Sequence, residues 1–307
     1  MAVADDSAPA IVGVGSVFID DIVLPDGRTH MGQLGGGTVH ALMGAALWGE
    51  RPGLSAYAGD GLPTAVEARL ARHLDLRGLV RLSQPQIRAW QLFEADGTRT
   101  EVHRVAQIEP FVSGTRPDDL PDAYRRSAAF YLLQTFDGIR PWLDAAPGLK
   151  LWEPNALTMH ASQRQTMRDI LSRDALAVVS PNLPEARAVY GLRDAGELIA
   201  AMLDDGAAAV ALRMGADGSL VATRDAPQPR WVGAVPVTQI ADQTGAGNTY
   251  CGGLLVGLRR GYDLFEAALL GAVSASFCIE TVGVLDPDAC PSAERDRRLA
   301  HLRAASE

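Results

Sequence analysis

Residues 242–258, DQTGAGNTYCGGLLVGL, join a glycine-rich turn to a run of apolar residues at helical spacing. Backbone N–H groups at a helix start can hold an anion where no side chain obstructs them. The turn of Gly245, Ala246 and Gly247 therefore predicts a site for a phosphate or for a developing negative charge. The next residue is Asn248, whose amide can hold a hydroxyl group but cannot carry its proton away. The alternative is that Asn248 is only the N-cap of the helix, for which Asn is well suited.

A second glycine-rich stretch, GVGSVF at 13–18, does not fit a dinucleotide site. The third glycine of that fingerprint is missing, and the residues that follow read as strand and turn. A pyrophosphate would therefore meet no helix N-terminus. The chain also has no Gly-Lys-Ser or Gly-Lys-Thr, which excludes a P-loop.

The chain of 307 residues is 47% hydrophobic and 21% charged, as expected of a globular protein with a sizeable core. Its net charge of −9 argues against nucleic acid or an anionic membrane surface as the main partner, because both need a basic face. We find no signal-peptide pattern and no apolar run near the roughly 18 residues of a membrane span. The three cysteines lack metal-ligand spacing and are interpreted as reduced thiols. We expect a cytoplasmic protein.

Short apolar runs alternate with helical patterns along most of the chain, and we find no internal repeat or low-complexity linker. This alternation predicts an α/β fold, a doubly wound and mostly parallel sheet with helices on both faces. The expected strands are 9–16, 54–59, 129–133, 150–154, 176–180, 208–213 and 219–223. The expected helices are 38–49, 63–74, 161–173, 183–205 with a capping box at 194–197, and a last one from the glycine turn to about residue 260.

Two segments break the alternation. Residues 17–34 and 88–104 each carry a Gly turn between strand-like runs and are expected to form β-hairpins. Two strand pairs inserted into an α/β domain predict a small β lid over a cleft, within one domain of residues 1–307. The exposed edges of such strands could pair between subunits, so a homodimer through the lid is a further expectation.

Taken together, these segments resemble the ribokinase-like (PfkB) family of carbohydrate and nucleoside kinases. The resemblance covers most of the chain, and its motifs come in the right order. They are GSVFID (15–20), GGGTVHALMGAALWG (35–49), AGDG (58–61), NLPE (182–185), LRMGADGSLV (212–221) and DQTGAGN (242–248).

The resemblance implies an ATP-dependent transfer of a phosphoryl group to an alcohol group, with Mg²⁺ and with a monovalent cation such as K⁺ as an option. The residues that it places toward substrate hydroxyls are Asp20, Gly36, Gly37 and His40. Those toward the nucleotide are Asn182, Arg213, Gly215 and Gly218, and Glu185 is tied to the magnesium ion. The groups that it places at the transferred phosphoryl are Gly245, Ala246, Gly247 and Asn248, supported by Asp242.

The sequence departs from the family pattern where the chemistry is done. The family has an Asp as the base at the position of Asn248. Phe18 and His40 stand where Asn is common, which favours a less hydroxylated substrate, and the acid expected after Trp152 is altered, to Glu-Pro-Asn at 153–155. Asp242, six residues before Asn248, is the first candidate for a substitute base.

Each assignment has a simpler alternative. Asp20 could be a solvated residue beside Asp21, since alternation turns only one of the two inward. His40 could be a packed histidine, and Asn182 with Glu185 could only cap the following helix. Arg213 could be a surface residue.

Three functions stay open: an active kinase, with a relocated base or a slow rate; a nucleotide- or metabolite-binding protein without transfer; and unrelated chemistry on the same fold. The alcohol substrate, a sugar or a nucleoside-like molecule, is not identified by the sequence.

Overall fold

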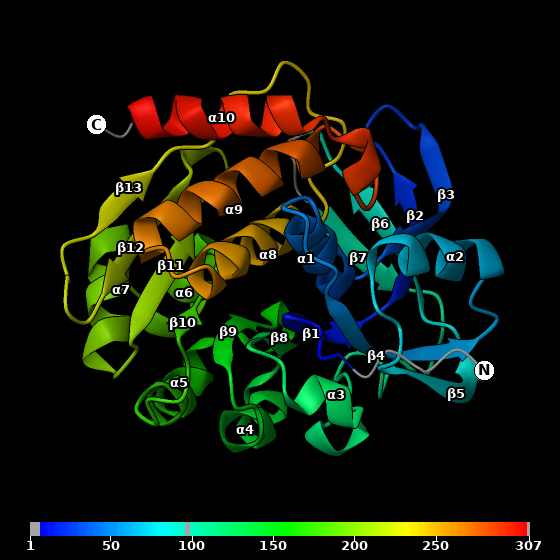
Figure 1. Ribbon diagram of the computed structural model, residues 1–307, viewed down its shortest axis with the longest axis horizontal. Helices are drawn as coiled ribbons and strands as arrows, with labels where there is room; N and C mark the ends of the chain where they lie inside the picture. The colour runs from blue at the N-terminus through cyan, green and yellow to red at the C-terminus, as the bar shows by residue number, and fades with distance from the viewer. Residues whose placement is uncertain (1–6, 96–98, 306–307) are drawn as a thin grey trace.

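The computed structural model describes residues 7–95 and 99–305 (Figure 1). Its main sheet has nine strands in the order β13-β12-β11-β10-β9-β8-β1-β4-β5. Their bounds are β1 (Ile11–Ser16), β4 (Gly53–Asp60), β5 (Leu79–Pro85), β8 (Ala129–Gln134), β9 (Leu149–Pro154), β10 (Val178–Val179), β11 (Ala209–Arg213), β12 (Ser219–Thr223) and β13 (Arg230–Val232). Every neighbouring pair from β5 to β11 is parallel, and only β12 and β13 run antiparallel to their neighbours.

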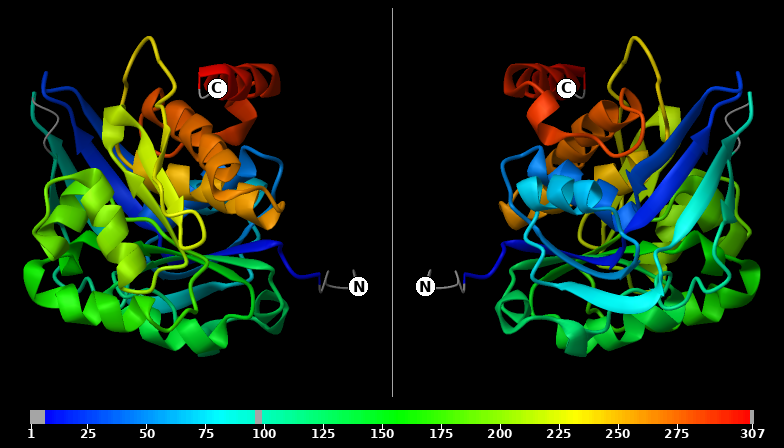
Figure 2. Two further views of the ribbon diagram at one scale, coloured as in Figure 1. Left: turned by 90° about the vertical axis from the view of Figure 1, so that its left-hand side faces the viewer. Right: turned by 90° about the vertical axis from the view of Figure 1, so that its right-hand side faces the viewer.

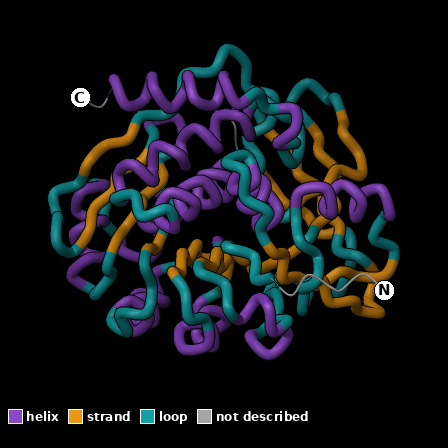
Figure 3. The backbone as a smooth tube through the Cα atoms, viewed as in Figure 1, coloured by secondary structure: helices purple, strands orange, loops and turns teal. Residues whose placement is uncertain are grey.

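Helices cover both faces of this sheet (Figures 1 and 2). One face carries α1 (Gly37–Ala46), α2 (Thr64–His73), α8 (Ala246–Arg259), α9 (Leu264–Ile279) and α10 (Ser292–Ala305). The other carries α3 (Asp122–Arg125), α4 (Phe136–Ala145), α5 (Arg164–Leu171), α6 (Leu183–Tyr190) and α7 (Ala195–Asp204). Figure 3 shows the strands as a layer between the two sets of helices. The predicted doubly wound α/β fold is therefore confirmed.

Strand alternation divides the apolar side chains between two cores. On β9, Leu151 packs with the α8 side and Trp152 with the opposite side. On β8, Tyr131 likewise faces the α8 side, while Phe130 and Leu132 face away. The same alternation turns Glu153, two residues after Leu151, toward α8.

The strands of the two predicted hairpins form one small four-stranded sheet, in the order β3-β2-β6-β7. The Gly turn predicted within 88–104 falls on residues 96–98, outside the described residues. Its strands are β2 (Phe18–Val23), β3 (Thr29–Gly35), β6 (Arg88–Phe93) and β7 (Arg99–His103). Each hairpin is antiparallel, and β2 pairs with β6 in parallel. Because β2 begins two residues after β1 ends, the small sheet is anchored at the carboxyl end of the main sheet, and it stands away from that sheet in Figure 2.

Some predicted bounds were wrong in detail. The helix expected over 183–205 is two helices, because Gly191 adopts a left-handed conformation (φ 70°) that ends α6. Asp194 starts α7 by accepting the N–H of Glu197 at 2.9 Å, but the reciprocal bond of a capping box is not formed among the described residues. No helix within the described ranges has both the length and the apolar character needed to cross a membrane.

Candidate functional site

A cavity of about 650 Å³ lies where β1, β9 and β11 end. The small sheet, the start of α1 and the turn before α8 complete its wall. Ligands of doubly wound sheets bind outside the carboxyl ends of the strands, and the volume falls within the range of small-molecule pockets. The cavity therefore brings together the glycine turn and the residues predicted to hold a substrate, from segments far apart in the chain.

The start of α8 has the geometry of an anion cradle. Gly245 is left-handed (φ 74°), and a Cβ there would lie 2.1 Å from the His40 ring, so only glycine fits. The N–H of Ala246 bonds the carbonyl of Gln243 at 3.3 Å. Those of Gly247 and Asn248 have no backbone acceptor within the described part of the chain. The N-cap of α8 is Gly245, so the alternative that Asn248 is the N-cap is wrong.

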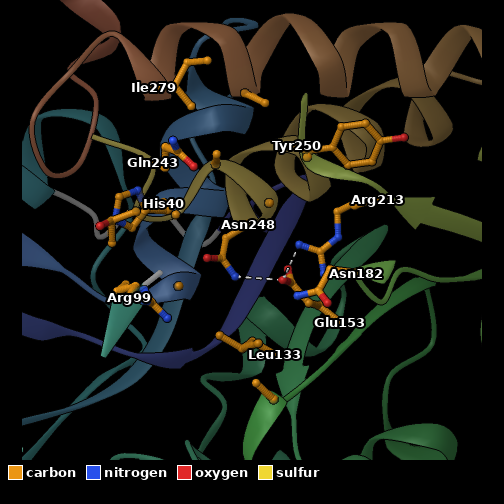
Figure 4. A pocket seen from close by; sticks show the side chains of 18 of the residues that line it. His40, Arg99, Leu133, Glu153, Asn182, Arg213, Gln243, Asn248, Tyr250 and Ile279 are labelled. Carbon is orange, nitrogen blue, oxygen red and sulfur yellow. Dashed lines mark hydrogen bonds and ion pairs between the residues drawn. The ribbon is translucent and has the colours of Figure 1, made fainter. Parts of the chain in front are cut away.

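The Asn248 side chain is bound into a buried polar network (Figure 4). Its Nδ2 donates to Glu153 Oε1 at 3.0 Å and to the Tyr131 hydroxyl at 3.2 Å. That hydroxyl in turn donates to Glu153 Oε2 at 2.7 Å. Burial, followed by the Glu153 charge, raises the pKa of Tyr131 well above its ordinary value, which keeps the phenol a donor. Both hydrogens of the amide are thus used within the protein.

Arg213 supplies the positive charge of this network. Its NH1 lies 2.9 Å from Glu153 Oε1, and its NH2 donates to the carbonyl of Ser180 at 2.8 Å. A Cβ at Gly247 would lie 2.0 Å from the same NH1, so the guanidinium rests directly against the cradle. Burial opposes the charge of Arg213, but the carboxylates of Glu153 and Glu185 offset that effect and raise its pKa above the ordinary value. The guanidinium is a buried, permanent cation rather than a surface residue.

Asn182 and Glu185 form a complete capping box at the start of α6. The Asn182 side chain accepts the N–H of Glu185, and Glu185 Oε2 accepts the N–H of Asn182, each at 2.9 Å. Glu185 also lines the cavity, 3.9 Å from Arg213 NH2. Burial raises the pKa of Glu185 despite that guanidinium. The cap and a place in the site are therefore compatible.

On the small sheet, Asp20 faces the cavity and is almost fully buried. Its Oδ1 accepts a hydrogen bond from Gln91 Nε2 at 3.1 Å, and the same nitrogen donates to Glu101 Oε2 at 3.0 Å. Burial raises the pKa of Asp20 to about 7, so this carboxyl group titrates near neutrality. A Cβ at Gly35 would lie 1.8 Å from Asp20 Oδ2, which makes glycine necessary there.

Asp21 faces the other side of the small sheet, as strand alternation predicts. It pairs with Arg88 at 3.0 Å and with Arg104, and it accepts the N–H of Gly32 at 2.7 Å. These bonds lower its pKa even though burial opposes them. Of the two acids, Asp20 is the one that lines the cavity.

Gly36, Gly37 and His40 bring the start of α1 to the same cavity. Gly36 is the N-cap of α1 (φ 99°), and a Cβ at Gly37 would lie 2.8 Å from Asn248 Nδ2. His40 is buried, and burial lowers its pKa to about 4, which leaves the imidazole neutral at pH 7. Its Nδ1 lies 3.7 Å from Cys278 Sγ, and its Nε2 has no partner among the described residues.

Gly215 and Gly218 shape the turn between β11 and β12, and both line the cavity. Each has a positive φ, of 63° and 82° respectively. A Cβ at Gly218 would lie 2.1 Å from the carbonyl oxygen of Val232, so a larger residue would disturb this part of the wall.

Asp242 is placed differently from a base. Its Oδ1 accepts the N–H of Thr244 at 2.8 Å, and its Oδ2 accepts the N–H of Gly283 at 2.9 Å. The next two residues, Gln243 and Thr244, form the cavity wall at this point. Asp242 therefore holds the turn in shape, and the geometry gives no support to its use as a substitute base for Asn248.

Sequence reasoning missed the acid that contacts Asn248. The sequence marks Glu153 only as a departure from the family pattern, and no motif points to Tyr131. The available signal was position: Glu153 is the next-to-last residue of a buried strand, at the edge of the sheet where ligands bind. Gln91, Arg99 and Glu101 of the small sheet also line the cavity, and no sequence motif marks them.

The family comparison supports the PfkB domain that the motifs predict. Residues 151–289 match the model described as pfkB family carbohydrate kinase. The chain is also 28% identical over 278 residues to the cytidine kinase of Thermococcus kodakarensis, which covers 85% of this chain and 92% of that relative.

Solved structures of several kinases share the fold of this chain. The adenosine kinase from Sinorhizobium meliloti superimposes with a TM-score of 0.78 at 19% identity, over 95% of this chain and 99% of its own. The ribokinase from Arabidopsis thaliana, complexed with ribose and ATP, gives a TM-score of 0.74 at 18% identity, over 95% and 99% of the two chains. The fold is therefore the ribokinase-like α/β fold.

Proposed function

We propose that the chain is an ATP-dependent kinase that transfers the γ-phosphoryl group to an alcohol group of a sugar or a nucleoside. One observation carries the proposal: a single cavity holds an open anion cradle at α8 and a buried carboxyl group, Asp20, suited to bind hydroxyls. The family match and the kinases that share the fold support the same reaction class.

In this reaction the substrate hydroxyl attacks the γ-phosphorus, the new O–P bond forms, and the bond to the bridging oxygen of ADP breaks. The N–H groups of Gly247 and Asn248 and the guanidinium of Arg213 would stabilise the charge on the transferred group. Phosphoryl transfer draws most of its rate from such positioning and electrostatics. Asp20 would hold other hydroxyls of the alcohol and so fix which one reacts.

The hydroxyl proton has no carboxylate to receive it at Asn248. In a loose transition state the proton can stay on the attacking oxygen until the O–P bond has formed. It then passes to an oxygen of the new phosphate ester and on to solvent. General-base catalysis is typically worth about 10²–10⁴-fold, so we propose a slower enzyme than one that keeps the base.

Glu185 and Asn182 fit a place beside a magnesium ion, because a carboxylate that lines the cavity is the kind of oxygen ligand that Mg²⁺ uses. When bound with ATP, the ion would offset charge on the phosphates. The capping bonds between the two residues fix the carboxylate in place before any ligand arrives.

The second candidate is a protein that binds a nucleotide or metabolite without transfer. It is favoured by the polar network itself, in which the Asn248 amide already donates to the Glu153 carboxylate and to the Tyr131 hydroxyl. Such a site could keep the anion cradle and lack turnover.

The test follows ADP release from ATP and Mg²⁺ with a panel of sugars and nucleosides, with the phosphorylated product identified by mass spectrometry. Calorimetric titration with ATP and Mg²⁺ runs in parallel. Asp20→Asn is the matched variant, expected to raise the KM for the alcohol while ATP binding stays unchanged. ATP binding without product would favour the second candidate. Absence of both product and ATP binding would overturn the proposal.

A further inference from the structure

The Asn248 amide is held in one orientation by its neighbours. Its two hydrogens are used by Glu153 and Tyr131, which leaves Oδ1 as the group that a ligand can meet. Figure 4 shows the amide nitrogen directed toward Glu153 and the oxygen on the opposite side, toward His40. Asn248 itself lines the cavity, beside the first residue of α1.

From this geometry we infer that Glu153 is a positioning residue. It carries the negative charge that Asn248 lacks, and it turns the Asn248 amide so that Oδ1 accepts the hydrogen of the substrate hydroxyl. The carboxylate and the amide act as one pair, in which the charge lies on strand β9 and the acceptor lies on helix α8. The inference rests on the proposed phosphoryl transfer.

Charge balance explains why the pair is stable in this form. Glu153 and Arg213 are buried together with their charged atoms 2.9 Å apart, so this pair is neutral when Asn248 is an amide, and Glu185 lies 3.9 Å from the same guanidinium. An aspartate at 248 would set a second carboxylate at hydrogen-bond distance from Glu153, and the guanidinium that would compensate both already lies beside Glu185. Like charges at such distances cannot both ionise without a large penalty. Asn248 is therefore the residue that Glu153 requires.

The orientation also explains how an amide can serve the reaction without being a base. When the hydroxyl hydrogen is bonded to Asn248 Oδ1, the lone pairs of the hydroxyl oxygen point away from the amide and are free to attack. The cradle beside Asn248 determines where the phosphorus lies. A misplaced nucleophile costs rate even when binding is unchanged. We expect Glu153 to act on kcat and to leave the KM for ATP near its wild-type value.

The experiment is a double-variant cycle on the full chain, with wild type, Glu153→Gln, Asn248→Asp and the two combined. Each single variant is expected to lower kcat at least about tenfold, the first by freeing the amide and the second by doubling the charge. The double variant restores one carboxylate and one amide, so its kcat should exceed the product of the two single effects by at least about tenfold. If the kcat of the double variant equals the product of the two single effects, the two residues act independently and the inference is overturned.

Asp119→Asn is the matched control for a lost carboxylate. Asp119 accepts a hydrogen bond from the Tyr57 hydroxyl at 2.7 Å, as Glu153 does from Tyr131. Combined with Asn248→Asp it should show no coupling, and coupling as large as that of Glu153 would count against the inference.

Urea denaturation of the same proteins gives a readout that needs no substrate. If Glu153 and Asn248 are coupled, the urea midpoint of the double variant should be higher than the sum of the two single shifts predicts. Additive shifts of the midpoint would contradict any coupling between the two residues. A wild-type protein that is silent with every alcohol would instead contradict the proposed function. An active wild type with multiplying effects on kcat contradicts the role of Glu153 alone.

Discussion

The two ends of the cavity are built in opposite ways. At the phosphoryl end, defined by Glu153, Arg213, Asn248 and Tyr131, the opposite charges are paired, although Arg213 Nε has no partner among the described residues. At the alcohol end, defined by Asp20, His40 and Gln91, the Asp20 carboxyl group is bonded to the Gln91 amide and forms no ion pair among the described residues. Within the described chain, His40 Nε2 and Gln91 Oε1 lack partners, although both atoms are buried.

This difference separates an end whose buried charges are paired from one whose buried carboxyl group has no cation paired with it in the part of the chain that the structure describes. A buried polar group without a partner costs about 1–3 kcal/mol, and a catalytic role or a bound ion or water is among the reasons that explain such groups. Hydroxyls of a bound alcohol could satisfy the atoms at the alcohol end. At the phosphoryl end, Glu153 is already bonded to groups of the protein and needs no partner from a ligand. This end serves to keep its charged groups in fixed positions. Variants at the phosphoryl end should therefore act first on stability and kcat, and variants at the alcohol end on KM.

The largest effect is expected for Arg213→Met. Removal of the guanidinium leaves Glu153 buried and unpaired, and the loss of one partner of a buried ion pair costs about 3–5 kcal/mol of unfolding free energy. Urea denaturation measures this loss. The matched control is Arg224→Met, whose partner Asp174 is 64% exposed and whose ion pair is worth about 0–1 kcal/mol. Equal losses for the two variants would show that the phosphoryl end is no more preorganised than the surface.

Asp20→Asn tests the alcohol end through pH. Burial raises the pKa of Asp20 from 3.8 to about 7 in the folded protein. The unfolded chain therefore gives up the proton at lower pH, and the stability from protonated Asp20 is lost as pH rises from about 4 to about 7. A shift of this size corresponds to roughly 4 kcal/mol. Asp20→Asn should remove this component from the pH dependence of the unfolding free energy, measured by urea denaturation.

The same titration should appear in binding. The groups whose charges act on Asp20 are Glu101, Arg99 and Asp242, and Gln91 donates to it. Because an ionised carboxylate holds hydroxyls more strongly, the KM for the alcohol should fall as pH rises through about 7 in the wild type and should stay flat in Asp20→Asn. Parallel pH curves for the two proteins would contradict the assignment of Asp20 to the alcohol end.

The fold could be predicted from local features, because alternating apolar runs and ordered motifs are properties of short stretches. The anion cradle was predicted for the same reason, since Gly245 to Asn248 is one turn. The error in the site came from a long-range contact. Asp242 lies six residues from Asn248 in the chain, yet both of its oxygens accept backbone N–H groups. Glu153 lies 95 residues away and contacts the amide directly.

Sequence spacing does not reveal whether Asp242 or Glu153 contacts Asn248, because the contact depends on the register of neighbouring strands. Leu133 of β8 pairs with Glu153 of β9, which sets the carboxylate beside the hydroxyl of Tyr131. The contact of His40 with Gly245 has the same origin, because it joins two helix starts. Such contacts follow from packing, and no local pattern encodes them.

Tyr131→Phe is expected to have a smaller effect at the phosphoryl end. It removes the donor to Glu153 Oε2 and the acceptor of one Asn248 hydrogen. A hydrogen bond to a charged group is worth about 1.5–3 kcal/mol, which is the expected loss of unfolding free energy. The KM for the alcohol should not change. The control is Tyr57→Phe, which removes the hydrogen bond to the partly exposed Asp119. A rise in the KM for the alcohol in Tyr131→Phe would contradict the separation of the two ends.

The smallest effect concerns Glu185, which lies beside the phosphoryl end and has two candidate roles. As the third residue of a capping box, it can be replaced by Gln without loss of the cap, whereas Glu185→Ala should cost about 1 kcal/mol of unfolding free energy. As a neighbour of magnesium, it cannot be replaced by Gln without loss of charge. Glu185→Gln should therefore keep the wild-type urea midpoint and raise the Mg²⁺ concentration needed for half-maximal activity. If Glu185→Gln leaves the Mg²⁺ dependence unchanged, the residue serves only as a cap. Glu185 then does not belong to the charged groups that act at the phosphoryl end.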